Sequence, residues 1–152
     1  MLAVIRIRGN VNVDVRLKRA LEVMMLHSKN HLVLVPEGPS SKRMLGKVRD
    51  YVTFGEVNAE TLARLLEKRG RLEGNKPLAE AYLKEKKTSF KELAQDIIGG
   101  KTSVRVLGIK PVFRLNSPSK GFERGGIKLS YNMGGVLGYR AQAINALIER
   151  MM

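Results

Sequence analysis

The sequence of 152 residues contains no cysteine and only two histidines, His27 and His31. The lack of cysteine excludes a disulfide framework, a cysteine-ligated metal site and a thiol nucleophile. The only acidic residues near the two histidines in sequence are Glu22 and Glu37. We therefore expect neither a metal site nor an acid–base pair there, and we predict no cofactor.

Long hydrophobic runs are absent as well. The apolar run at 32–35 is far too short to cross a bilayer, and Arg6 follows only five residues from the start. We therefore expect no signal peptide, no membrane span and no membrane partner, which fits a cytoplasmic protein. Phosphate-loop, dinucleotide-binding and nucleophile-elbow motifs do not occur, so we predict no enzymatic activity.

Positive charge is the feature that the sequence has in excess. Twenty-eight Lys and Arg face 14 Asp and Glu, which gives a net charge of +14. The charge is +5 over residues 1–57, +2 over 58–100 and +7 over 101–152. Such a surplus in a small protein indicates a polyanionic partner, above all a nucleic acid, and the two ends of the chain are the expected contact surfaces.

The hydrophobic pattern predicts alternating strands and helices in the first third of the chain. Period-two alternation favours strands over 2–8, 31–36 and 51–57, and apolar residues at helical spacing favour helices over 13–27 and 41–52. This β-α-β-α-β order predicts an α+β core over 1–57, with helices packed on a sheet. We treat 58–152 as a second unit that packs on this core.

The remaining elements are predicted from caps and periodicity. Helices are expected over 60–69, 77–86 and 89–98, with Asn58 and Gly70 as caps of the first helix and a Ser89/Glu92 capping box on the third. Strands are expected over 111–115 and 127–131, and a final helix over 139–152. We call residues 58–110 the helical insert; most of it, 58–100, is nearly neutral.

Residues 113–140 form the most informative stretch, which we call the basic segment. It is rich in glycine and carries five cations against one acid, Glu123. We predict a loop that is mobile in the free protein and that binds phosphates through cations and unpaired backbone amides. Its predicted RNA-contacting residues are Arg114, Lys120, Gly121, Phe122, Arg124, Gly125, Gly126, Lys128, Asn132, Gly134, Gly135 and Arg140. The alternative is a solvated surface loop without a partner.

A second basic surface is predicted from the first third of the chain. Its members are Arg6, Arg8, Arg16, Arg19, Lys42, Arg43 and Lys47. Gly46 lies in the middle of a predicted helix, where glycine costs about 1 kcal/mol relative to alanine. Either RNA backbone or a tightly packed neighbouring strand accounts for the missing side chain.

Two blocks of sequence resemble a known family. The block KRMLGKVRDYVTFGEV at 42–57 and the block at 113–151 that begins FRLNSPSKGFERGG are similar to the universal large-subunit ribosomal protein L-thirty family, in its long archaeal and eukaryotic form. The resemblance implies a ferredoxin-like fold, with an antiparallel sheet covered by helices on one face. It also implies a place in the cytoplasmic ribosome and contact with the large-subunit rRNA and neighbouring ribosomal proteins. 5S rRNA is a further candidate partner, and an obligate homo-oligomer is not expected.

One rival from another class stays open at this point. Ferredoxin-like proteins also serve as regulatory modules that bind small molecules, because fold does not fix function. That rival gives no role to the charge of +14 or to the basic segment. An enzyme acting on nucleic acid is a weaker rival, because the acids concentrate in the helical insert, where helix solvation explains them.

Overall fold

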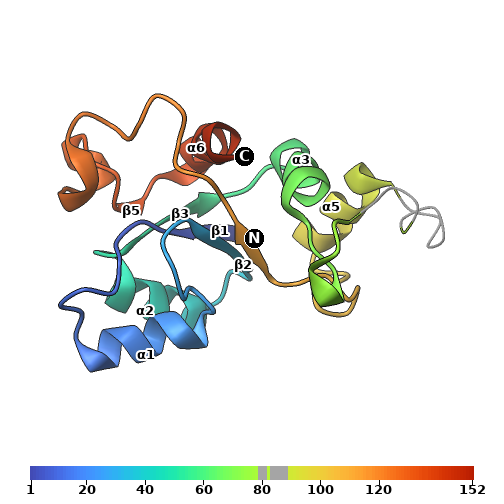
Figure 1. The fold of residues 1–152 in the computed structure, drawn as a ribbon, viewed down its shortest axis with the longest axis horizontal. Helices are drawn as coiled ribbons and strands as arrows, with labels where there is room; N and C mark the ends of the chain where they lie inside the picture. The colour runs from blue at the N-terminus through green and yellow to red at the C-terminus, as the bar shows by residue number, and fades with distance from the viewer. Residues whose placement is uncertain (79–81, 83–88) are drawn as a thin grey trace.

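The computed structural model describes residues 1–78, 82 and 89–152, and its centre is a five-stranded sheet in the order β4-β2-β1-β3-β5 (Figure 1). The strands are β1 (Leu2–Arg6), β2 (His31–Val35), β3 (Val52–Glu56), β4 (Val112–Arg114) and β5 (Gly138–Tyr139). β1 pairs antiparallel with β2 and β3, and β4 pairs antiparallel with β2. β5 adds to β3 in parallel, so the sheet is mixed. The predicted α+β, ferredoxin-like fold class is confirmed, and the parallel edge strand is a detail that the sequence did not predict.

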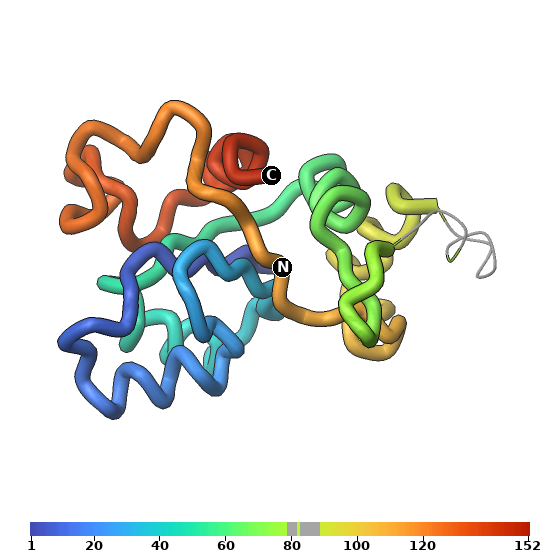
Figure 2. The backbone as a smooth tube through the Cα atoms, viewed as in Figure 1, coloured from blue at the N-terminus to red at the C-terminus, as the bar shows by residue number. Residues whose placement is uncertain are grey.

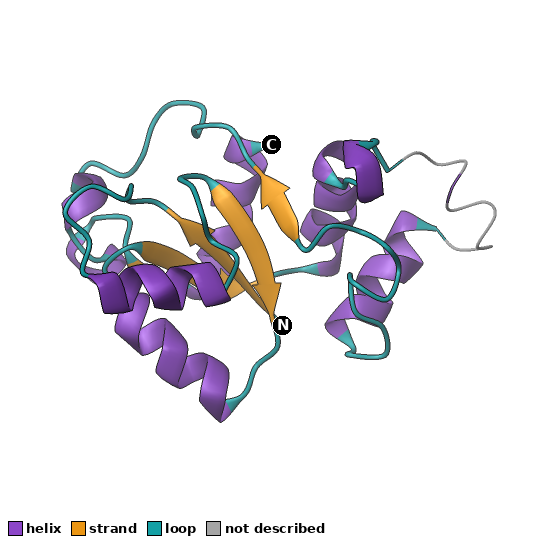
Figure 3. Cartoon of the chain, turned by 60° about the horizontal axis from the view of Figure 1, so that its bottom comes forward, coloured by secondary structure: helices purple, strands orange, loops and turns teal. Residues whose placement is uncertain are grey.

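Helices α1 (Val15–Val23) and α2 (Pro39–Val48) cover one face of the sheet (Figure 3). Asp14 is the N-cap of α1, and its side chain accepts a hydrogen bond from the Arg16 amide; α2 begins at Pro39. Side chains alternate across β1, so Leu2 and Val4 pack under these helices. The apolar residues Leu21, Leu45 and Val48 of the two helices complete this part of the core.

The opposite face of the sheet is covered too, by the C-terminal part of the chain. Ala3 and Ile5 of β1 pack into a second apolar cluster with α6 (Ile144–Met151) and the helical insert. Gly55 allows this approach, because a side chain there would bring Cβ to 2.0 Å from the carbonyl oxygen of Ala141. Helices therefore lie on both faces, rather than on one as the resemblance implied.

Within its described residues, the helical insert packs beside the sheet through α3 (Ala59–Arg69) and α5 (Phe90–Ile98), and the short helix η1 (Glu73–Asn75) follows α3 in the chain. The capping box of Ser89 and Glu92 is formed as predicted, and α3 ends at Gly70. Asn58 holds the cap position of α3 without a side-chain cap hydrogen bond. The helix predicted over 77–86 falls mostly on 79–81 and 83–88, which lie outside the described residues.

The prediction of a strand over 127–131 was wrong. Two short 3-10 helices, η2 (Gly126–Lys128) and η3 (Tyr131–Met133), occupy this stretch. Ile127 and Leu129 alternate as in a strand, yet both are about two-fifths exposed, so no buried face holds the stretch in a sheet. Figure 2 shows the chain running from the insert along the sheet, through these turns and back to the short η4 (Ala141–Ala143) and α6. None of the helices in the described part of the chain is both long and apolar enough to cross a membrane.

Candidate nucleic-acid interface

The outer surface of α1 and α2 carries five predicted contact residues. α2 buries Leu45 and Val48 against the sheet, and its cations point away from it. All five side chains are exposed, and none has a hydrogen-bond or ion-pair partner within the described residues: Arg16, Arg19, Lys42, Arg43 and Lys47. These cations, which we call the helical basic face, are free to meet an external anion.

Gly46 lies on the same exposed side of α2. Apart from its chain neighbours and the backbone of its own helix, a Cβ placed on it would have no atom of the chain within 4 Å. The packing of a neighbouring strand therefore does not explain this glycine, and one of the two explanations for it is removed. A close approach by an external partner remains.

Arg6 is a correction to the predicted surface, because its side chain is buried and only 1% exposed. Its guanidinium donates to the carbonyl oxygens of Arg8 at 2.8 Å, Leu26 at 2.6 Å, His27 at 3.1 Å and Gly9 at 3.0 Å, and to Asn10 Oδ1. Burial lowers the pKa of Arg6, yet an arginine stays charged at neutral pH. Its hydrogen bonds join the end of β1 to the end of α1, so its role is structural.

Arg8 is intermediate in exposure between the cations of the helical basic face and the buried Arg6. Its side chain is half-buried, with the guanidinium carbon 4.9 Å from the centre of the Tyr51 ring. It also donates to the carbonyl oxygen of Asp50 at 3.4 Å. This arrangement holds the side chain against residues 50 and 51, just after α2, and leaves part of it accessible to solvent.

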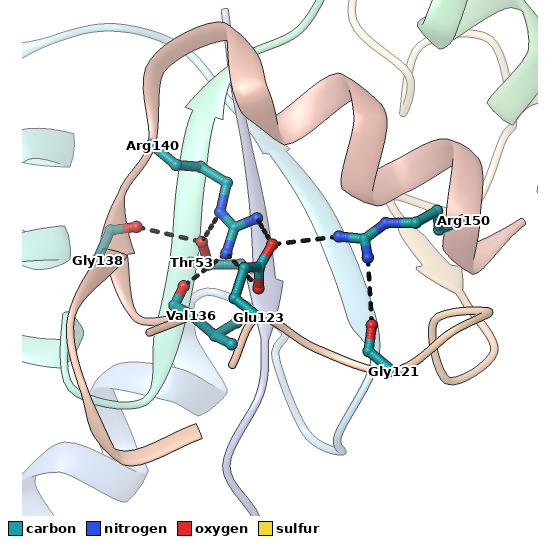
Figure 4. A network of polar contacts seen from close by, with 7 residues as sticks. All are labelled: Thr53, Gly121, Glu123, Val136, Gly138, Arg140 and Arg150. Carbon is teal, nitrogen blue, oxygen red and sulfur yellow. Dashed lines mark hydrogen bonds and ion pairs between the residues drawn. The ribbon is translucent and has the colours of Figure 1, made fainter. Parts of the chain in front are cut away.

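Arg140 is the second correction, because it is the centre of a polar network inside the basic segment (Figure 4). Only 3% of it is exposed, and Nε donates to Thr53 Oγ1 at 2.8 Å. Its two terminal nitrogens donate to the Glu123 carboxylate at 3.0 and 3.4 Å, and one of them also donates to the carbonyl oxygen of Val136. The guanidinium carbon lies 4.6 Å from the centre of the Tyr131 ring. Arg140 therefore holds the basic segment on β3 instead of pointing toward RNA.

Glu123 joins two arginines in this network. Arg150 of α6 donates to Glu123 Oε1 at 3.1 Å and to the carbonyl oxygen of Gly121 at 3.2 Å. Burial alone would raise the pKa of Glu123, but the hydrogen bond from Arg140, a main-chain hydrogen bond and the two positive charges together hold this pKa below its usual value. The only acid of the basic segment is thus an internal anchor.

The prediction of unpaired glycine amides was wrong. Five amides that were predicted to bind phosphate instead donate to carbonyl oxygens of the chain itself, at 2.9 to 3.0 Å. The pairs are Gly121 to Pro118, Gly125 to Gly134, Gly126 to Glu123, Gly134 to Tyr131 and Gly135 to Ser130. Gly135 is needed for close packing, because a Cβ there would lie 2.2 Å from the carbonyl oxygen of Leu129. This internal hydrogen bonding also argues against the expected mobility of the segment.

The other predicted residues of the basic segment divide between surface and interior. Four cations and one amide are exposed and have no side-chain ion pair among the described residues: Arg114, Lys120, Arg124, Lys128 and Asn132. Phe122 is half-buried and packs against the apolar cluster of α6. This packing argues against the predicted contact of Phe122 with RNA.

A groove of about 580 Å³ separates α2 from the basic segment. Lys42 and Gly46 line it on the α2 side, and Lys128, Tyr131 and Asn132 line it on the other. At its floor the ring centres of Phe54 and Tyr139 lie 5.7 Å apart. The Tyr139 hydroxyl donates to Glu56 at 2.6 Å, which raises the pKa of Tyr139.

Sequence reasoning missed Phe54 and Glu56 as groove residues. Phe54 and Glu56 point to the same face of β3, which the alternation of that strand indicates, but only the pairing of β5 with β3 brings Tyr139 beside them. The groove lining combines amides, aromatic rings and the cations Lys42, Arg49 and Lys128 with three carboxylates, Glu37, Asp50 and Glu56. Cations, amides and aromatic rings are the groups that contact RNA backbone and unpaired bases.

Comparisons with known proteins agree with this chemistry. The family described as ribosomal protein L30p/L7e matches residues 2–52. Proteins named large ribosomal subunit protein uL30 match nearly the whole chain. Those of Nanoarchaeum equitans and Methanococcus vannielii are 46% identical over 99% of this chain and over 97% and 98% of their own lengths. That of Hyperthermus butylicus is 46% identical over 100% of this chain and 90% of its own.

Proposed function

We propose a structural role in the large ribosomal subunit for this chain, which belongs to the ribosomal protein L30p/L7e (uL30) family. Membership makes it a ribosomal protein of the cytoplasmic ribosome and not an enzyme. Partners are accordingly rRNA and other ribosomal proteins. Contact with 5S rRNA and the absence of an obligate homo-oligomer stay predictions.

The protein binds large-subunit rRNA through two surfaces that border one groove. The first is the helical basic face on α1 and α2, and the second consists of Lys120, Arg124 and Lys128 on the basic segment. The observation that carries the proposal is that these cations are exposed and unpaired within the described residues, whereas Arg6 and Arg140 are internally bonded. The exposed cations are thus available to neutralise phosphates.

The basic segment acts as a pre-folded support rather than as a loop that folds on RNA. Its glycine amides are used in turns, and Arg140 and Glu123 fasten it to β3 and α6. A support that is ordered before binding avoids part of the entropy loss of association. Lys128 and Asn132 are then held at the groove rim, opposite Lys42 and Gly46. An RNA strand lying in the groove passes close to the backbone of α2 at Gly46.

A triple substitution on α2 tests this proposal. Lys42→Gln/Arg43→Gln/Lys47→Gln removes three exposed charges without touching the buried side of the helix. Because each phosphate contact is an independent electrostatic term, we expect binding to a large-subunit rRNA transcript to weaken at least about tenfold at moderate salt. Filter binding of the purified full chain measures this.

The matched control removes three charges from the helical insert, in Lys68→Gln/Lys91→Gln/Lys101→Gln. These side chains are exposed and lie outside both proposed surfaces. We expect the control to stay within about threefold of the wild type. Equal weakening by both variants would show that only net charge matters, and would contradict the proposed surfaces.

The small-molecule regulatory module is not favoured. The groove volume falls within the range of small-molecule sites, about 300–1,000 Å³. However, the relatives that match over almost their whole length are named as ribosomal proteins, and the unpaired cations around the groove have no role in that reading.

A further inference from the structure

A second concave site lies where the helical insert meets the edge strand β4. Its volume is about 230 Å³, and its lining consists of Arg69, Arg71, Asn75, Lys110, Val112 and Arg114. Four of these six residues are cations, and no acidic residue lines the site. Among them, only Arg114 was predicted from sequence to contact RNA.

Backbone contacts bring these cations together from distant parts of the chain. The Lys110 amide donates to the carbonyl oxygen of Arg71 at 2.8 Å, which fixes the two residues side by side. Arg69 is the last residue of α3, and its Nη2 donates to the main-chain oxygen of Met152 at 2.6 Å. Arg114 comes from β4, where it pairs with His31 of β2. The site therefore exists only in the folded chain.

Apart from Arg69, which donates to Met152, the cations of this site have no counter-charge within the described residues. No side-chain ion pair or hydrogen bond joins Arg71, Lys110 or Arg114 to a carboxylate there. Gathering like charges in a hollow is unfavourable unless an anion is bound, because the low-dielectric walls strengthen their repulsion.

The neighbouring His31 lies in the same positive electrostatic potential, which affects its pKa. Its Nδ1 atom is buried without a hydrogen-bond partner. Burial, and then the positive charges of Arg114, His27 and Arg6, lower the pKa of His31. An anion seated beside Arg114 would relieve part of this potential.

We propose that this site binds a phosphodiester group of large-subunit rRNA. The inference rests on the proposed function and adds a third contact to it, where the helical insert meets β4. Guanidinium groups match the oxygens of a phosphate in a planar fork, and Asn75 supplies a neutral amide. A protein neighbour is less well matched, since protein interfaces centre on apolar residues, and only Val112 is apolar here.

The test compares Arg71→Gln/Arg114→Gln with the wild type in filter binding of the full chain to a large-subunit rRNA transcript. The expected result is about tenfold weaker binding. Lys91→Gln/Lys101→Gln removes the same charge from α5 and its C-terminal end, and we expect it to stay within about twofold. Arg71→Lys/Arg114→Lys keeps the charge but loses the fork, so its affinity should lie between those of the wild type and the glutamine variant.

The outcomes separate this inference from the proposed function. If the wild type and the α2 triple variant behave as proposed but Arg71→Gln/Arg114→Gln binds like its control, the phosphate site is overturned and the function stands. If that variant keeps its rRNA affinity but fails to enter large subunits in cells, an acidic protein surface is the ligand, and the inference is likewise overturned. Circular dichroism melting shows whether a variant is folded. If the glutamine variant does not fold, the lysine variant decides, and affinity equal to the wild type counts against the site.

Discussion

At the scale of single residues, a cation's sequence context did not reveal whether it is buried. Arg6 and Arg8 are two positions apart in the sequence, yet Arg6 is enclosed by carbonyl oxygens and Arg8 rests on Tyr51. Arg140 looked like one more cation of a basic stretch, whereas its partners Thr53 and Glu123 lie far from it in the sequence. Contacts between residues distant in the sequence bury Arg6 and Arg140. The exposure of the cations on α1 and α2 could therefore be predicted from helical periodicity, whereas the burial of Arg6 and Arg140 could not.

Removing Glu123 leaves a buried arginine without its counter-charge. We expect Glu123→Gln to lower the free energy of unfolding at pH 7 by about 2 kcal/mol. This is less than the 3–5 kcal/mol typical of a fully buried pair, because a quarter of the Glu123 side chain is exposed. Urea unfolding measures it. Glu149→Gln is the control: it breaks an exposed pair with Arg64 and should change stability by less than about 1 kcal/mol.

The same pair gives a signed pH dependence. Because the folded pKa of Glu123 lies below its ordinary value of 4.5, the stabilisation is fully present above that value. It is lost as the pH falls through the folded pKa, where the native carboxylate is protonated. The stability difference between wild type and Glu123→Gln should therefore shrink as the pH is lowered from neutral to below 4.5. A difference that stays constant over this range would contradict the assignment.

Arg6 should matter for folding and not for RNA binding. Arg6→Gln leaves the carbonyl oxygens of Leu26, His27 and Gly9 with fewer donors, so we expect a loss of about 3 kcal/mol of stability in thermal or urea unfolding. The comparison is Arg8→Gln, whose loss should stay near 1 kcal/mol, because its ring contact is partly exposed. If Arg6→Gln folds as stably as the wild type, the internal role of Arg6 is wrong.

At the scale of elements, short-range sequence patterns correctly predicted the features that depend on residues close together in the chain. The capping box of Ser89 and Glu92 and the apolar stripe of α3 follow from short-range patterns, and both are formed. The strand expected at 127–131 failed because alternation alone cannot show whether a partner strand is available. β5 has only two residues and joins β3 by parallel pairing, which no local pattern indicates. The division of the chain at residue 57 stays a prediction.

Two glycines should respond in opposite ways to alanine. In Gly46→Ala the new Cβ points into open space on α2, so we expect a gain of about 0.5–1 kcal/mol in stability from helix propensity. In Gly135→Ala the new Cβ would lie 2.2 Å from the carbonyl oxygen of Leu129, so we expect a loss of more than about 2 kcal/mol. Thermal melts of the two variants measure this contrast.

Gly46→Ala also tests the groove. If RNA backbone approaches α2 at this position, the more stable variant should bind rRNA more weakly than the wild type. Unchanged or tighter binding would mean that the RNA path does not pass over Gly46.

At the scale of the whole molecule, the charged residues behind the net charge of +14 divide into those bonded inside the fold and those exposed to solvent. Arg6 and Arg140 hold the fold together, and Glu123 is used to anchor the basic segment. Among the described residues, exposed cations without internal partners remain on α1 and α2 and on the basic segment, and the half-buried Arg71 and Lys110 line the second concave site. Composition alone predicted a polyanionic partner, but only the fold separates the cations that face outward from those that hold the core.

The salt dependence of rRNA binding by the unmodified protein tests this account most directly. Eight exposed cations on the two proposed surfaces are available to displace counterions, so a plot of log affinity against log salt concentration should fall with a slope of about −5 or steeper. Filter binding to large-subunit rRNA between low and moderate salt measures the slope. A slope near zero, or no binding at low salt, would contradict the claim that these outward cations neutralise RNA phosphates.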